Sequence, residues 1–80
     1  MEKLMKLFKE YANKKQSLIL YINWNKVANW SIYIEHGDSK TVIFDENYAS
    51  LEYVSARAFE KLAEWGQEFE DLEDILYNIF

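Results

Sequence analysis

Apolar side chains recur every three or four positions along the first fifteen residues, and lysines and other polar residues occupy the positions between them. This spacing predicts an amphipathic helix over Glu2–Lys15. Its buried stripe would consist of Leu4, Leu7, Phe8, Tyr11 and Ala12. The spacing then changes to short runs of β-branched and aromatic residues, which are typical of strands. The three strands expected from these runs are Leu18–Ile22, Trp30–Glu35 and Thr41–Phe44.

Short polar connections separate the expected strands. Residues 36–39 are typical of a hairpin turn, in which Gly37 supplies a positive φ. Residues 23–29 contain three asparagines and predict a turn of several residues, and residues 45–47 would end the sheet. Because the connections are short, neighbouring strands should pair antiparallel.

Helical spacing returns after residue 50. Ser50 is suited to cap a helix over Leu51–Trp65. Gly66 stands where a residue in the left-handed conformation commonly ends a helix, so a last helix is expected from about Glu70 or Asp71 to the end of the chain. The buried stripe of the middle helix would contain Leu51, Val54, Ala58, Leu62 and Trp65, with Phe59 alongside.

These elements define an expected α+β fold in the order αβββαα. The chain would form a single domain over residues 1–80, in which helices cover one face of a three-stranded antiparallel sheet. Half of the residues are hydrophobic, and three Trp, six Tyr and five Phe can supply a small core. This composition excludes a disordered chain, which requires low hydrophobicity.

Composition also bears on where the protein acts. The chain has no cysteine, which excludes disulfides and thiolate metal sites and fits a reducing interior. Residues 1–6 lack the apolar core of a signal peptide, and the longest apolar run, Leu18–Ile22, is far shorter than the ~20 residues that cross a bilayer. We therefore expect a soluble cytoplasmic protein.

No residue pattern in the chain points to an enzyme. His36 is the only histidine, and we expect it in an exposed turn without catalytic or metal-binding partners. The two glycines form no phosphate-binding loop, and Asp71, Glu73 and Asp74 lack the spacing of an EF-hand calcium loop. We predict no catalytic activity, no cofactor and no metal. A double-stranded RNA-binding domain shares the αβββα order, but residues 45–52 are acidic here, the wrong sign for contact with phosphates.

Charge divides the chain into a basic and an acidic half. Residues 1–40 carry +3, from seven lysines and four acids, and residues 41–80 carry −8, from two basic and ten acidic residues. Seven of these acids lie between Glu60 and Asp74, opposed only by Lys61.

Two interpretations of this acidic run stay open on charge alone. Carboxylates in the first turn of a helix stabilise the helix dipole by about 0.3–1 kcal/mol each, which favours an ordinary solvated face. Like charges one turn apart repel, however, and duplex DNA carries one negative charge per ~1.7 Å of axis. The second interpretation is therefore a face that imitates DNA and binds a basic protein that handles nucleic acid.

The segment Trp65–Ile75 reads Trp-Gly-Gln-Glu-Phe-Glu-Asp-Leu-Glu-Asp-Ile. It resembles the junction between the second and third helices of small acidic type II-A anti-CRISPR proteins, which have a Trp-x-Gln-Glu-aromatic-Glu-Asp-x-Glu-acid pattern there. The αβββαα order is similar as well. The similarity in amino-acid sequence covers roughly a dozen positions. Phe69 stands where the family has tyrosine, and Leu72 stands where it has another acid.

The resemblance implies a function. These proteins are phage-derived inhibitors that occupy the PAM-reading groove of an RNA-guided nuclease as DNA mimics, and an acidic hairpin turn also touches the nuclease. The partner would be a CRISPR effector nuclease, with no direct contact to nucleic acid or membrane, and the chain would be a monomer or small homo-oligomer. The partner-binding residues carried over are Asp38, Gln67, Glu68, Phe69, Glu70, Asp71, Glu73 and Asp74.

Two other functions remain open at this point. The chain could be an interaction module of a phage or mobile element with an unrelated target, bound through aromatic residues around Trp24 and Trp30. It could also be a homo-oligomeric structural protein, in which Trp24, Trp30 and Tyr33 form an apolar sheet face that no helix covers.

Overall fold

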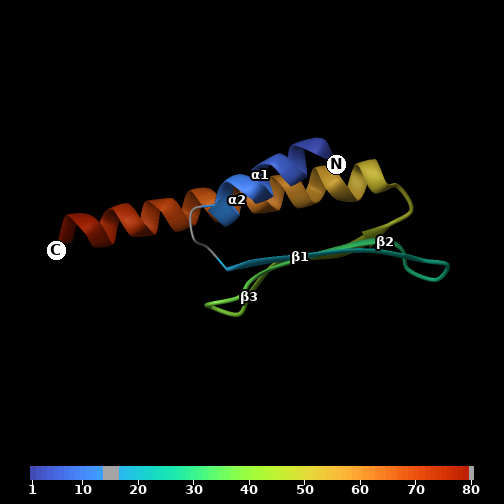
Figure 1. Ribbon diagram of the computed structural model, residues 1–80, viewed down its shortest axis with the longest axis horizontal. Helices are drawn as coiled ribbons and strands as arrows, with labels where there is room; N and C mark the ends of the chain where they lie inside the picture. The colour runs from blue at the N-terminus through green and yellow to red at the C-terminus, as the bar shows by residue number, and fades with distance from the viewer. Residues whose placement is uncertain (14–16, 80) are drawn as a thin grey trace.

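The structure, a computed structural model, describes the backbone of residues 1–13 and 17–79 and the side chains of residues 1–13 and 17–68. A helix is followed by three strands and a long helix, and Figure 1 shows both helices on the same side of the sheet. The α+β class is therefore confirmed. The elements are α1 (Glu2–Asn13), β1 (Leu18–Asn25), β2 (Asn29–His36), β3 (Thr41–Tyr48) and α2 (Leu51–Ile79).

The sheet is antiparallel in the order β1-β2-β3, as its short connections predict. β1 and β2 pair without interruption, whereas a β-bulge between Ile34 and Glu35 leaves Ile43 of β3 without a partner on β2. Because facing residues in adjacent strands lie on one side of the sheet, the register defines the face that the helices cover. That face carries Leu18, Leu20, Ile22 and Trp24 of β1, Trp30, Ile32, Ile34 and His36 of β2, and Phe44, Glu46 and Tyr48 of β3.

The strands extend further than the sequence pattern predicts. β1 continues to Asn25, and β3 continues through residues 45–47, which were expected to end the sheet. Aromatic cross-strand partners support both extensions, because Trp30 faces Trp24 on one side and Tyr48 on the other. The first hairpin turn therefore shrinks to three residues, 26–28.

The buried core joins the two layers. It consists of Leu4, Ile32, Ile34, Phe44, Val54, Ala58 and Leu62. The expected stripes of both helices are confirmed, since Leu7, Phe8, Tyr11, Leu51, Phe59 and Trp65 pack around these residues. Ser50 caps α2 as expected, because its hydroxyl oxygen accepts a hydrogen bond of 3.2 Å from the backbone N–H of Tyr53.

Gly66 does not end a helix. α2 runs through it as one continuous helix of 29 residues, so the two helices expected after the sheet are one. Gly66 has no positive φ and is buried beside α1. A Cβ atom at this position would overlap the side-chain ring of Tyr11. Glycine is required here because α1 approaches closely, rather than because the backbone turns.

α1 lies alongside the first part of α2 and runs in the same direction. Residues 1–4 line a pocket with residues 52–60, while Tyr11 contacts Trp65 and Gly66. α2 then continues past the end of α1 and past the sheet (Figure 1). The molecule is elongated as a result, with principal extents of 51 × 22 × 17 Å.

Candidate partner-binding site

His36 lies at the end of β2, immediately before the β2–β3 turn. The expectation that it is exposed is wrong, because only 6% of its surface is accessible. Its ring lies against that of Trp65 of α2, with centroids 5.1 Å apart. α2 crosses above this end of the sheet, and that contact between distant segments is not visible in the sequence around the turn.

Hydrogen bonds of His36 shape the β2–β3 turn. Its Nδ1 lies 2.7 Å from the hydroxyl oxygen of Ser39, which in turn donates a hydrogen bond of 2.8 Å to the hydroxyl of Thr41. A hydroxyl can both donate and accept, so Ser39 links the His36 ring to Thr41 within the turn. The turn is therefore fixed both internally and against α2.

Gly37 does not have a positive φ, in contrast to the expectation, and its lack of a side chain instead suits a close approach to Ser17. Its N–H donates a hydrogen bond of 2.5 Å to the carbonyl oxygen of Ser17, and a Cβ atom would lie 3.1 Å from that same oxygen. The left-handed conformation falls instead on Lys40, with a φ of 56°. The turn is thereby tied to the start of β1.

Three of the residues carried over from the anti-CRISPR resemblance have described side chains, and they lie at the same end of the molecule. Asp38 is exposed in the β2–β3 turn, and Gln67 and Glu68 are exposed on α2 directly after Trp65. The contact between His36 and Trp65 holds the two segments together, and Figure 1 shows the turn below α2, at the end of the sheet beyond which the helix continues. The sequence places these segments about thirty residues apart, so only the fold brings them together.

The other five carried-over residues lie in the last part of α2. Their backbone is helical and continuous with Gln67 and Glu68, without the break that the sequence predicts. Their side chains lie outside the described residues, so their position as a set stays a prediction; they are Phe69, Glu70, Asp71, Glu73 and Asp74.

The ion pairs between described residues do not involve the lysines of α1. Arg57 of α2 forms two hydrogen bonds with Glu46 of β3, at 2.7 and 3.1 Å, and Lys61 lies 3.5 Å from Glu64. The single arginine of the chain is therefore engaged inside the molecule, where it attaches α2 to the sheet. A carboxylate and a guanidinium fit this two-bond geometry well.

Tyr48 completes this polar attachment. Its hydroxyl donates a hydrogen bond of 2.5 Å to Glu46, its ring packs edge-on against Tyr53, and Arg57 lies over its face. The hydrogen bonds from Arg57 and Tyr48 lower the pKa of Glu46 from 4.5 to about 2. The hydrogen bond to Glu46 in turn raises the pKa of the Tyr48 hydroxyl. Glu46 is therefore charged at neutral pH, and its carboxylate is held by contacts within the molecule.

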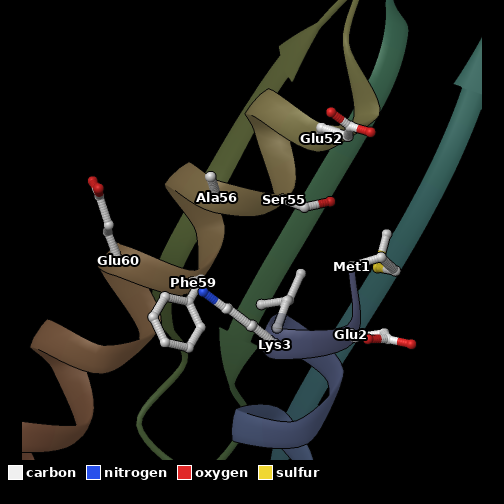
Figure 2. A pocket seen from close by; sticks show the side chains of 9 residues that line it. Met1, Glu2, Lys3, Glu52, Ser55, Ala56, Phe59 and Glu60 are labelled. Atoms are coloured by element: carbon white, nitrogen blue, oxygen red, sulfur yellow. The ribbon is translucent and has the colours of Figure 1, made fainter.

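A pocket of about 550 Å³ lies between the start of α1 and the first half of α2, a place where no sequence pattern predicts a site. Figure 2 shows Ser55 extending from α2 toward the side on which Met1 lies. The Ser55 hydroxyl is buried, with 3% of the residue exposed, and has no hydrogen-bond partner in the described part of the chain. Ser55 lies four residues after Leu51 and three before Ala58, so helical spacing places it in the buried stripe. A polar residue at such a position is the sequence signal that could have identified this pocket.

The tryptophans do not form the uncovered sheet face considered from the sequence. Trp24 and Trp30 lie on the face that carries the helices, and Tyr33 lies on the opposite face. Tyr33 packs against Tyr21, with ring centroids 6.1 Å apart. Burial raises the pKa of the Tyr33 hydroxyl, and the nearby charges of Glu35 and Asp45 raise it further.

No protein-family model, curated protein or solved structure matches the chain. The resemblance of residues 65–75 to anti-CRISPR proteins therefore stays a prediction. Within the described residues, no three carboxylate or imidazole groups gather as a metal ion would require. Neither helix, over the same residues, has an apolar stretch long enough to cross a membrane.

Proposed function

We propose that the chain is a non-catalytic protein inhibitor that imitates DNA and occupies the PAM-binding groove of an RNA-guided type II CRISPR nuclease. It would act in the cytoplasm of the host cell, where that nuclease meets its target. One observation carries the proposal. The fold brings Asp38 of the β2–β3 turn to the same end of the sheet as Gln67 and Glu68, where the acidic part of α2 begins.

Carboxylates suit the groove chemically. A nuclease of this class reads its PAM with arginines that make paired hydrogen bonds to guanine edges inside a positively charged channel. A carboxylate offers guanidinium the same paired acceptors. The acids of α2 would replace base edges and phosphates, Gln67 would add a hydrogen bond, Phe69 would add an apolar contact, and Asp38 would extend the contact from the turn.

Internal contacts engage the basic side chains that lie nearest to the acids in sequence. Arg57 and Lys61, the two basic residues of the second half of the chain, pair with Glu46 and Glu64. Asp38 and Glu68 belong to neither pair and are exposed. Opposite charges on the two proteins would speed association and make it sensitive to salt.

The test is competition between the protein and PAM-containing duplex DNA for a purified nuclease loaded with guide RNA. We expect the two to exclude each other, with affinity falling as salt rises. Asp71→Lys combined with Asp74→Lys should abolish inhibition, and Asp38→Lys or Glu68→Lys should weaken it. A ternary complex of nuclease, duplex and protein would contradict the proposal.

Glu52→Lys is the matched control, because Glu52 is an exposed acid at the opposite end of α2. It should leave inhibition intact, apart from a small loss of helix stability. Circular dichroism should show that the double variant is folded. Unfolding of that variant would favour the alternative in which the acids only stabilise the helix.

A further inference from the structure

The two edges of the sheet differ in how they are protected. An edge strand exposes unpaired N–H and C=O groups, and proteins commonly protect it with charged residues, bulges or proline. β3 has Asp45, Glu46 and a bulge at Ile43. β1 has eight residues without a charge, a proline or an interruption in its pairing with β2. In the part of the chain that the structure describes, no strand pairs with the outer side of β1.

The second half of β1 is also left open on the helix-covered face. Leu18 and Leu20 are half-buried there, whereas Ile22 and Trp24 expose 40% and 56% of their surfaces on the same face. α1 thus covers only part of the strand that borders it. Exposed large apolar side chains beside an unprotected edge indicate an interaction surface.

We propose that β1 pairs with β1 of a second copy of this chain, to form one antiparallel sheet of six strands centred on Ile22. Facing residues in an antiparallel pair lie on the same side of the sheet, so a two-fold axis through Ile22 places it opposite its own copy. Leu20 then faces Trp24 of the second copy. The covered half of each strand meets the open half of the other, so the apolar side chains of both strands form one continuous row on the helix-covered face.

The charge pattern makes β1 the strand at which a second copy can approach. Each chain carries −5, so two copies repel over most of their surfaces, and the uncharged edge of β1 is where they can approach. A basic partner, in contrast, would gain no electrostatic attraction from a strand without acids. The edges that remain in the pair are both β3, whose charges and bulge oppose further growth. The pair therefore closes as a dimer and leaves both acidic ends free.

Sedimentation equilibrium of the intact protein tests this inference independently of the nuclease. We expect twice the chain mass of 9.6 kDa. Ile22→Lys should give monomers, because it places two like charges opposite each other at the axis. The control is Val42→Lys, a substitution on β3 at a residue with 52% exposure, and it should leave the dimer intact. A monomeric wild type at high concentration, or a dimeric Ile22→Lys variant that folds normally, would overturn the proposal.

Cross-linking locates the interface even if Ile22→Lys fails to fold. The chain has no native cysteine, so Ile22→Cys introduces a single thiol. Facing Cα atoms in an antiparallel pair lie about 4.5–5.5 Å apart, within the range of a disulfide. Mild oxidation should convert Ile22→Cys to a covalent dimer much faster than Val42→Cys. Equal rates would overturn the proposal, as would protection of β1 amides from exchange only after nuclease is added.

Discussion

The two ends of the molecule are held by different kinds of contact. At one end, the β2–β3 turn, the last residues of α1 and the middle of α2 meet through His36, Tyr11, Trp65 and Gly66. At the other end, the β1–β2 turn is stabilised by polar contacts close to it. The side-chain oxygen of Asn25 accepts hydrogen bonds from the N–H groups of residues 27 and 28, at 2.9 and 2.6 Å.

This difference separates a turn fixed by tertiary packing from a turn fixed by its own sequence. The first can hold Asp38 in a constant position relative to Gln67 and Glu68, because aromatic rings and a glycine contact connect the segments. The second is held mainly by its own asparagines, with Asn29 at a φ of 63°, and the side chain of Asn47 on β3 adds one hydrogen bond to the carbonyl oxygen of Ala28. The packed end therefore has the properties that a binding surface made of separate segments requires.

The largest expected effect comes from Gly66→Ala, which adds a methyl group at the packed end. At a solvated helix position the change would stabilise the protein by about 1 kcal/mol. Here the methyl group overlaps Tyr11, so we expect a loss of about 1–3 kcal/mol in the free energy of unfolding, measured by denaturant titration.

Combining Gly66→Ala with Tyr11→Leu provides the control for that prediction. The smaller side chain should remove the overlap and recover part of the loss. If Gly66→Ala alone raises stability, the close approach of α1 and α2 is wrong, and the packed end is not held as described.

The next effect concerns the polar attachment of α2 to the sheet. Because the folded pKa of Glu46 is about 2, below its ordinary value of 4.5, the pair with Arg57 stabilises the protein fully above pH 4.5. That contribution is lost as the pH falls from 4.5 toward 2. Unfolding titrations over this range should show a steeper loss of stability for the wild type than for Glu46→Gln. Parallel curves would show that the pair does not form.

Asn25→Ala tests the other end. It removes two hydrogen bonds to the turn, and we expect a loss of about 1 kcal/mol in unfolding free energy. Faster hydrogen exchange should be confined to residues 26–29, while the amides around His36 stay protected. A change that spreads to the β2–β3 turn would mean that the two ends are coupled rather than independent.

The smallest expected effect is a gain in stability. Ser55→Ala removes a buried hydroxyl without a partner and replaces serine with a better helix former, so unfolding free energy should rise by about 0.5–1 kcal/mol. Ala56→Ser, at the exposed neighbouring position, is the matched reverse change and should lower stability slightly. A loss of stability in Ser55→Ala would indicate a bound water or ligand in the pocket.

The regular patterns of the chain were readable because they depend on local chemistry. Helical spacing identified the buried stripes of α1 and α2, and Ser50 identified the start of α2. The sequence does not distinguish the roles of the two glycines, since a glycine needed for a positive φ and a glycine suited to close packing look alike in sequence. Gly37 and Gly66 are both of the second kind, and only the position of Ser17 or Tyr11 reveals it.

For the candidate site, too, the sequence predicts the local features but not the contacts between distant segments. The run of acids in residues 60–74 is plain in the sequence, as is an acid in the hairpin turn. That Asp38 lies at the same end as Gln67 depends on the burial of His36 against Trp65, a contact between residues 29 positions apart that no local pattern encodes. The continuity of α2 was also missed, because a glycine within a helix is indistinguishable from one that ends it.

The length of α2 affects how the protein moves through solution. A compact chain of 80 residues has a radius of gyration of about 12 Å, whereas this one has 13.8 Å and is more than twice as long as it is wide. An extended particle experiences more friction than a sphere of equal mass. On a column calibrated with globular standards, one copy will therefore elute early and imitate a heavier species, and scattered light or sedimentation, rather than elution volume, reports its mass.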